Sequence, residues 1–338
     1  MRFSSGAAIY LHMYTGRLLT ALAVMAVNGW AQSTAAVAGP VTGFIFDSQA
    51  AAMRPMLGIP GAAYLGKAMA TGLNAASVAP DGSAALAVAA DGKLVLYTGL
   101  RSAIPQALAV PGAIANPDHF AWATNAAAVY SSSSGQGQIL TSLATSPSAA
   151  APVDLSSLPG QVAAMAFDGQ NLVLAVASGG IYMASAAGVQ RIAAAAHPAA
   201  LVLSGASLFF ADSQSQQIQQ VQNYAATPAT VPFANDNSID SPAGLQISAD
   251  GKRLFAANAG NRKLAVYDIG SRSLVQTVDL SFTPTRLDRF GDTSVFLMNG
   301  SGQGPVYVAR DGGEGKAAVY FVPAPRGHKP PKAPIRPN

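Results

Sequence analysis

Cysteine is absent from the 338-residue sequence, so the chain forms no disulfide and offers no thiolate for catalysis or zinc binding. Haem attachment through Cys-x-x-Cys-His and lipid modification of cysteine are excluded for the same reason. Glutamate is almost absent: Glu314 is the only one, and the other 15 acidic residues are aspartates. Aspartate disfavours helix interiors and suits turns, so the acidic residues indicate where the chain turns.

Charged residues make up only 11% of the sequence, against about 25% in an average soluble domain. The formal net charge is +4, but Arg2 and Arg17 lie near the N-terminus and four more cations lie near the C-terminus. The body between them holds 14 cations against 16 acidic residues, which removes the basic surface that nucleic acid requires. We therefore expect no nucleic-acid partner.

No apolar run reaches the roughly 20 residues that a membrane-spanning helix needs. A shorter run, Leu18 to Val27, follows Arg17 and is followed by Asn28-Gly29-Trp30-Ala31, which places the small residues Gly29 and Ala31 three positions and one position before Gln32. This order is typical of a secretory signal. We predict a signal peptide over residues 1–31, removed on export to the periplasm or the extracellular space. The alternative is an uncleaved membrane anchor, and translation from Met13 would give a signal of more ordinary length.

A period of about 40 residues runs through the rest of the chain, as expected for blades of four short strands. First strands are predicted to begin near Ala75, Asp118, Val162, Ala199, Ala243 and Pro284. Five Asp-Gly pairs separate the apolar runs, at hairpin positions where glycine can adopt positive φ. They are Asp81-Gly82, Asp91-Gly92, Asp168-Gly169, Asp250-Gly251 and Asp311-Gly312. The pattern predicts an all-β fold, a β-propeller of four-stranded blades.

The length of the repeat region sets the number of blades. Residues 39–323, divided by a period of about 41, give about seven. Val41 to Gly66 reads as a third and a fourth strand without a first and a second. Seven blades with an incomplete first are therefore predicted, and six blades with an N-terminal hairpin are the alternative. The N-terminal segment is expected to meet the last blade and hide the sheet edges.

Residues 324–338 hold four cations, five prolines and almost no apolar side chain. We predict a disordered, basic, proline-rich tail. It is either a solvated terminus or an electrostatic tether to an anionic polymer or membrane surface. The protein is expected to be a monomer, with no transmembrane segment in the mature chain.

The segment Ala243 to Leu280 is the best preserved repeat, and after its first residue it reads GLQISADGKRLFAANAGNRKLAVYDIGSRSLVQTVDL. It resembles the YVTN-type β-propeller repeat, and Val41 to Gly66 is similar to the opening of exported bacterial propeller proteins of unassigned role. Proteins with similar repeats include surface-layer proteins, periplasmic propellers that bind other macromolecules, and distant lactone-hydrolysing, quinoprotein and haem enzymes. The resemblance implies a fold rather than an activity.

One loop gathers the oxygen ligands that calcium prefers, through Asn235, Asp236, Asn237 and Asp240. It lacks the Asp-x-Asp-x-Asp-Gly order and the bidentate glutamate of a calcium loop. A loop of Asx turns explains the same residues. Calcium is the one candidate ion, and no cofactor is predicted.

The densest charge group in the body consists of Arg286, Asp288 and Arg289. Arg286 and Asp288 are two positions apart on a predicted innermost strand, so their side chains point to one side of it. A guanidinium that lines the channel can hold a carboxylate ligand. The alternative is that Arg286 and Asp288 pair across neighbouring blades and close the channel.

His119 and Trp122 are further candidates, on the strand that begins near Asp118. Outside the two termini His197 is the only other histidine, so a histidine metal site is not indicated. Phe120 and Trp122 alternate along the strand and are either core side chains or a stacking platform for a ligand.

The sequence contains no Gly-x-Ser-x-Gly elbow and no phosphate-binding Gly-Lys-Ser/Thr motif. We therefore expect an exported, non-catalytic propeller that acts as a binding or cell-envelope scaffold, with a protein or an envelope polymer as partner. The alternative is a channel-mouth enzyme, either a lactonase-like hydrolase or a quinoprotein-like oxidoreductase. Three or more carboxylates or amides converging in the channel would favour the enzyme.

Overall fold

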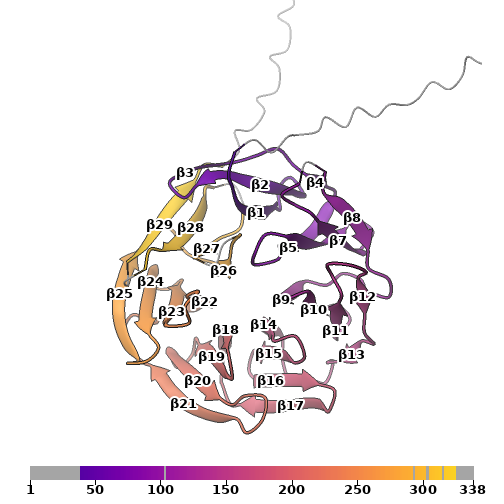
Figure 1. Ribbon diagram of the computed structural model, residues 1–338. Coiled ribbons are helices and arrows are strands. Elements are labelled where there is room, and N and C mark those ends of the chain that lie inside the picture. Colours follow the sequence, from indigo (N-terminus) through magenta and orange to yellow (C-terminus); the bar gives the residue numbers. More distant parts are fainter. Residues whose placement is uncertain (1–38, 103, 292–293, 302–303, 314–315, 325–338) are drawn as a thin grey trace, which may run out of the picture. The chain divides into compact units, whose positions relative to one another are not determined.

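The computed structural model describes residues 39–324, apart from 103, 292–293, 302–303 and 314–315. These residues form 29 strands and no helix, arranged as seven sheets around a central channel (Figure 1). The predicted propeller of seven blades is confirmed, and the six-bladed alternative is wrong. The range predicted as signal peptide, 1–31, lies outside the described residues, as does the predicted tail beyond Ala324.

Each blade is an antiparallel sheet whose strands follow one another along the chain. The first three blades are β1 (Val41–Asp47), β2 (Ala52–Ile59), β3 (Ala62–Leu65) and β4 (Ala70–Thr71); β5 (Leu73–Val78), β6 (Ala84–Ala89), β7 (Leu94–Thr98) and β8 (Gln106–Ala109); and β9 (His119–Ala123), β10 (Ala126–Ser131), β11 (Gln136–Thr141), β12 (Ser148–Ala149) and β13 (Val153–Asp154). In the third blade β12 and β13 both pair with β11, so they share the outer position.

The other four blades have four strands each. They are β14 (Val162–Phe167), β15 (Leu172–Val176), β16 (Gly180–Ser185) and β17 (Gly188–Ala193); β18 (Pro198–Ser204), β19 (Ser207–Asp212), β20 (Gln217–Gln222) and β21 (Ala229–Ala234); β22 (Pro242–Ile247), β23 (Arg253–Asn258), β24 (Lys263–Asp268) and β25 (Ser273–Asp279); and β26 (Asp288–Arg289), β27 (Val295–Leu297), β28 (Val306–Asp311) and β29 (Ala317–Val322). The last blade has the shortest inner strands.

Burial changes from the channel to the rim of the ring. Every residue of the second strand β15 is buried, whereas the outer strand β25 is mostly exposed. A second strand is covered on both faces by neighbouring blades, so an uninterrupted apolar run such as LVLAV suits it. The apolar side chains pack between adjacent sheets and form one cluster per blade interface.

The five Asp-Gly pairs lie in turns between strands, as predicted. In each, the aspartate Oδ1 accepts the backbone N–H two residues later, at 2.7 to 3.1 Å. Gly82, Gly92, Gly169 and Gly251 adopt positive φ, but Gly312 does not, and Gly313 takes that conformation instead. The prediction is therefore wrong by one residue in the last turn, where the chain turns one position later.

The first blade is incomplete, but it lacks a different strand from the one predicted. Phe44 of β1 packs with Ala85 and Ala87 of the second strand β6, and Ile45 packs with the second strand β27. β1 therefore occupies a second-strand position, and β2 and β3 follow as third and fourth (Figure 1). Within the described residues no strand pairs with the inner edge of β1, so the innermost strand is the one that this blade lacks.

The ring closes by packing of two separate sheets rather than by strands from both ends sharing one blade. Ile45 and Met56 of the first blade pack with Val295 and Val308 of the last. A single bridge joins Asp47 to Ser301, and the Ser301 hydroxyl donates to the Phe46 carbonyl at 2.8 Å. The predicted meeting of the N-terminal segment with the last blade is confirmed in this form.

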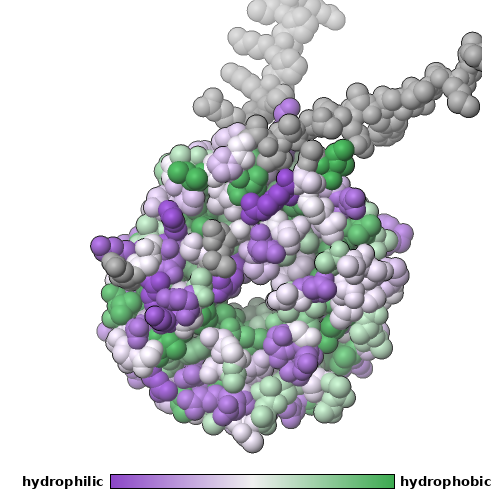
Figure 2. All heavy atoms as spheres, in the orientation of Figure 1, coloured by the Kyte–Doolittle hydropathy of each residue, from purple (hydrophilic) through white to green (hydrophobic). Residues whose placement is uncertain are grey.

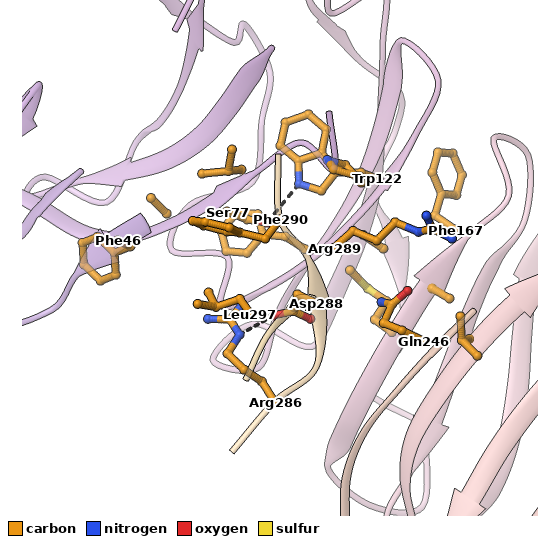
Figure 3. A pocket seen from close by; sticks show the side chains of 18 of the residues that line it. Phe46, Ser77, Trp122, Phe167, Gln246, Arg286, Asp288, Arg289, Phe290 and Leu297 are labelled. Atoms are coloured by element: carbon orange, nitrogen blue, oxygen red, sulfur yellow. Dashed lines mark hydrogen bonds and ion pairs between the residues drawn. The ribbon is translucent and has the colours of Figure 1, made fainter. Parts of the chain in front are cut away.

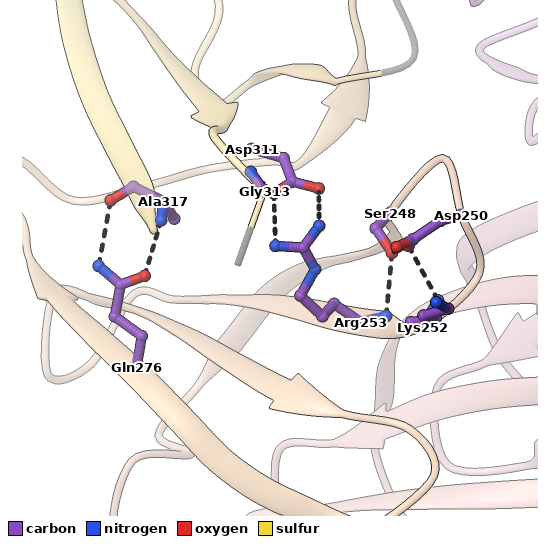
Figure 4. A network of polar contacts seen from close by, with 8 residues as sticks. All are labelled: Ser248, Asp250, Lys252, Arg253, Gln276, Asp311, Gly313 and Ala317. Carbon is purple, nitrogen blue, oxygen red and sulfur yellow. Dashed lines mark hydrogen bonds and ion pairs between the residues drawn. The ribbon is translucent and has the colours of Figure 1, made fainter. Parts of the chain in front are cut away.

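Polar side chains also join the sixth and seventh blades (Figure 4). The guanidinium of Arg253 on β23 forms an ion pair with Asp311 of β28, with N···O distances of 2.8 and 2.9 Å. On the outer strands, the Gln276 amide accepts the Ala317 N–H at 2.7 Å and donates to the Ala317 carbonyl at 3.1 Å. These contacts fix the register of the two blades near the ring closure.

Candidate functional site

A central channel passes between the blades and opens on the face shown in Figure 2. All seven blades contribute to its wall, which encloses about 300 Å³. Its lining is mostly alanine, aromatic and branched apolar side chains. The polar side chains that line it are Ser77, Trp122, Gln246, Arg286, Asp288 and Arg289. The wall thus has two guanidinium groups against one carboxylate.

The two openings of the channel differ, and we name them by the innermost strands. The start face is where these strands begin, at residues such as His119 of β9, and the end face is where they run into turns such as Asp81-Gly82. A cavity of about 540 Å³ at the start face is bordered by His119, Gln246, Thr285, Arg286 and Asp288. It is the first candidate site.

Arg286 and Asp288 both border this start-face cavity, and their spacing had predicted only that the two side chains point to one side of the strand. The Arg286 Nε donates to Asp288 Oδ2, and each side chain is 46% exposed (Figure 3). The pair lies within one segment, so the expectation that these residues pair across neighbouring blades is wrong. Strand β26 begins at Asp288, so Arg286 precedes the strand. Because it lies outside the strand, the Arg286 side chain can turn toward the Asp288 carboxylate.

His119 borders the same cavity and is partly buried. Burial lowers the pKa of its imidazole, while the nearby Asp118 carboxylate opposes this effect. Its ring lies against Tyr130 of β10, with centroids 5.7 Å apart. The imidazole is therefore neutral near neutral pH and adds no fixed charge to the opening.

Arg289 lies further along the channel and reaches the neighbouring blade. Its Nη2 donates to the Ile247 carbonyl at the end of β22, at 2.7 Å. Burial lowers the pKa of its guanidinium. Arginine stays protonated near neutral pH even when its pKa is lowered. Arg289 therefore brings a positive charge to the channel wall toward the end face.

Trp122 stands at the end face between the second and third blades. Its indole Nε1 donates to Ser77 Oγ of β5 at 2.9 Å (Figure 3). Phe120 and Trp122 both pack partly on the apolar cluster between these blades, as the core alternative predicts. Trp122 also borders two cavities, so its ring has an accessible surface as well.

The loop proposed for calcium is largely occupied by its own hydrogen bonds. Asp236 Oδ1 accepts the Ser238 N–H at 2.9 Å and the Tyr267 hydroxyl at 3.1 Å. The Asp240 N–H donates to Asn258 Oδ1 at 3.1 Å. The bond from the Ser238 N–H is an Asx turn, as the alternative predicted, whereas the other two join the loop to β24 and β23. Asn235 and Asn237 are exposed beside them. In the part of the chain that the structure describes, no group of three His, Cys, Asp or Glu side chains is placed to hold a metal.

Gln246 was missed by the sequence reasoning, although it lines the channel at the start-face cavity. It occupies the fourth position of AGLQIS, inside the best preserved repeat. A polar residue among apolar ones on an innermost strand was the available signal. Which side of the strand it faces depends on the register of β22, and a bulge shifts that register after Pro242.

Comparison with known proteins supports the fold of this chain, but it shows neither a family nor an activity. No family model and no curated protein matches the sequence. A functionally unknown protein from Desulfotomaculum acetoxidans is 10% identical and superposes with a TM-score of 0.62, over 85% of this chain and 100% of that one. A candidate 6-phosphogluconolactonase from Bacteroides fragilis is 11% identical, with a TM-score of 0.59 over 84% of this chain and 95% of that one.

A chain of a mitotic checkpoint complex is 12% identical, with a TM-score of 0.54 over 84% of this chain and 89% of that one. One of the three proteins has no known function and the names of the other two have nothing in common, and identities this low carry no activity from one protein to another. Together they show that this chain is a seven-bladed β-propeller. No helix in the described part of the chain has the length and apolar character to cross a membrane.

Proposed function

We propose that the chain is an exported, non-catalytic propeller that binds an acidic partner at the start face of its channel. The observation that carries this proposal is the half-exposed Arg286, set at a cavity of about 540 Å³. Arg289 adds a second positive charge to the channel, and Asp288 is the only carboxylate among the described residues of its lining. A guanidinium in such a hollow favours a carboxylate ligand, with charge-assisted hydrogen bonds.

The partner we propose is a protein segment or envelope polymer that carries carboxylate groups. We also propose that the repeats are of the YVTN type. Exported propellers with such repeats include proteins that bind other macromolecules, which supports a binding role. Lactonase-like or quinoprotein-like catalysis is less well supported, because the described channel wall offers one carboxylate and one amide rather than three or more converging groups.

Binding of a defined acidic probe, hexa-aspartate, tests the site. We expect calorimetry to detect binding that weakens as salt is raised, and Arg286→Ala to weaken it about tenfold or more, since hydrogen bonds to charged groups contribute about 1.5–3 kcal/mol. The matched control is Arg310→Ala, which removes an exposed arginine outside the channel lining. Equal binding by both variants would contradict the proposed site.

A lactone-hydrolysis assay on the same proteins tests the catalytic alternative. Turnover of gluconolactone that Arg286→Ala abolishes and Arg310→Ala preserves would replace the binding role with an enzymatic one.

Export is tested separately by expression of the full chain in a Gram-negative host. We expect the periplasmic or secreted form to begin at Gln32, because Gly29 and Ala31 precede it at the positions that signal peptidase reads. A protein that keeps Leu18 to Val27 and stays with the membrane would show the uncleaved anchor instead. Cytoplasmic protein with an intact N-terminus would contradict export.

A further inference from the structure

A second cavity lies at the end face, between the second and third blades. It holds about 640 Å³, within the roughly 300–1,000 Å³ of ordinary ligand pockets. Its walls are turns that follow β5, β7, β9 and β11. Arg289 is the one lining residue that this cavity shares with the channel-mouth proposal, and the rest of its described lining combines an aromatic ring with polar side chains.

Trp122 supplies the aromatic wall of this end-face cavity. The bond from its indole Nε1 to Ser77 Oγ holds the ring at one edge, and the apolar cluster between the blades supports it. A tryptophan fixed in this way gives a flat apolar surface at small entropic cost when a ligand stacks on it. Alanine and leucine side chains, among them Ala84 and Leu143, extend the apolar floor.

Polar groups at the rim retain hydrogen-bonding capacity. Within the described residues, no hydrogen bond uses the hydroxyls of Thr98 and Thr124. Asn125 Oδ1 accepts the Ala144 N–H at 2.6 Å, which leaves its Nδ2 as a donor. Asp81 Oδ1 accepts from Ser83, and its second oxygen remains an acceptor. The rim therefore offers both donors and acceptors around a flat apolar wall.

The charges around the cavity disfavour a charged ligand. Among the lining residues that the structure describes, Asp81 is the only carboxylate, and Arg289 borders the cavity as well. Arg101 is close to Asp81, since its Nη2 donates to the Asp81 carbonyl at 3.4 Å. Arg101 is outside the lining, so the described lining sets one guanidinium against one carboxylate, whereas the channel wall has two against one. A cationic ligand meets Arg289, and an anionic one meets Asp81. A neutral ring with hydroxyl groups matches the apolar wall and the mixed rim without either conflict.

We infer that this end-face cavity binds a neutral saccharide, with one sugar ring stacked on Trp122 and its hydroxyl groups bonded to Asp81, Thr98 and Asn125. The inference stands apart from the acidic partner at the start face. A sugar site and an acidic-ligand site on opposite faces differ in their response to salt, because only the second depends on charge.

Intrinsic fluorescence gives a direct test, because the chain has two tryptophans, Trp30 and Trp122. The full chain carrying Trp30→Phe reports on Trp122 alone. We expect at least one of three neutral probes, cellobiose, maltose and the disaccharide of N-acetylglucosamine, to shift its emission in a saturable way. The shift is expected to be unchanged between low salt and 0.5 M salt.

Calorimetry on variants shows whether the stacked ring is responsible. Trp122→Ala is expected to weaken saccharide binding about tenfold or more, because it removes the flat apolar surface on which the sugar ring stacks. Trp122→Phe keeps a ring and is expected to retain part of the affinity. Tyr64→Ala removes an exposed aromatic ring of β3 outside the cavity and is expected to change nothing.

Two results would overturn the inference. One is the absence of saturable binding for all three sugars in a folded Trp30→Phe chain. The other is equal loss of affinity in Trp122→Ala and Tyr64→Ala, which would indicate non-specific stacking. Hexa-aspartate binding that survives either result leaves the start-face proposal standing, so the two proposals fail separately.

Discussion

Arg253 and Asp311 show how a single buried pair joins two blades. Their side chains are only 12% and 5% exposed, and their bidentate contact spans the sixth and seventh blades. Loss of one partner leaves the other charge enclosed without compensation, which costs far more than an exposed pair contributes. The pair therefore supports the register of the blades beside the ring closure.

Asp311→Ala is expected to lower the free energy of unfolding by about 3 kcal/mol, because it leaves the Arg253 guanidinium buried and unpaired. Urea unfolding followed by circular dichroism measures this. Adding Arg253→Met is expected to restore most of the loss. Lys93→Ala, which removes the exposed pair with Asp91 but keeps the turn bond from the Lys93 N–H to Asp91, is the control and should leave the midpoint unchanged. A single-variant loss no larger than that of the control would contradict the role of the pair.

Asp168 links the fourth and fifth blades, because its Oδ2 accepts the Tyr224 hydroxyl at 2.8 Å. Burial acts to raise the pKa of this carboxyl, but N–H donors from Asn171 and Gln170 and the Tyr224 hydroxyl outweigh burial and lower it. A lowered folded pKa contributes stability above the unfolded value of about 3.9, and this contribution is lost as the pH falls through the folded pKa.

Asp168→Asn is therefore expected to unfold with a smaller loss of stability between pH 5.5 and pH 3 than the parent protein. Denaturation midpoints at the two pH values measure the difference. The exposed Asp279→Asn serves as the control and should keep the parent pH dependence. Parallel pH profiles for Asp168→Asn and the parent would refute the linkage.

At the scale of the strand and turn, the blade from β22 to β25 shows why its polar residues recur. Asp250 closes the first turn by accepting the Lys252 N–H and the Ser248 hydroxyl. Asn258 is fully buried at the end of β23, where its amide donates to the Ala256 carbonyl and accepts the Asp240 N–H. Asp268 accepts the Ser271 N–H after β24. Asn258 and Asp268 therefore fix the loops at the ends of their strands.

Gly251 provides a test of this turn, because it has φ of +72° and no atom near the place of a Cβ. Gly251→Ala is expected to lower the free energy of unfolding by about 1 kcal/mol through backbone strain alone. Gly304→Ala, at an open position outside the left-handed region, should change it little. Thermal unfolding of both variants measures this, and equal shifts would show that the conformation of Gly251 is not the cause.

At the scale of the whole molecule, the seam between the first and last blades determines whether the ring acts as one unit. The seam has apolar packing and a single bridge, because no strand pairing joins the two described sheets along their length. The first blade also lacks an innermost strand within the described residues. It should therefore be the region where local opening begins.

Ile45→Ala is expected to destabilise the protein by about 2–5 kcal/mol, as a buried large-to-small change does. Its effect on hydrogen exchange should be greatest in β1, β2, β27 and β28, on both sides of the seam. Leu174→Ala in the fourth blade is the matched core variant, and it should speed exchange around β15 instead. The same exchange pattern in both variants would mean that the ring opens only as a whole.

The sequence predicted much of the candidate site but not its arrangement. The spacing of Arg286 and Asp288 was enough to place both on the channel, because alternation along an extended segment is local. Their mutual ion pair was not predicted, since it depends on β26 being only two residues long. The contributions of Gln246 and of the turns around Trp122 depend on which blades become neighbours.

The repeat period, the apolar second strands and the Asp-Gly turns determined the propeller, its seven blades and its incomplete beginning from the sequence alone. Each of these properties arises within a few residues of chain, where hydrogen bonds of turns and alternation of side chains act directly. The tertiary structure decided which strand the first blade lacks, how the ring closes and which side chains share a cavity. Those outcomes depend on packing between sheets, where residues such as Phe46 and Ser301 meet although some 255 positions separate them.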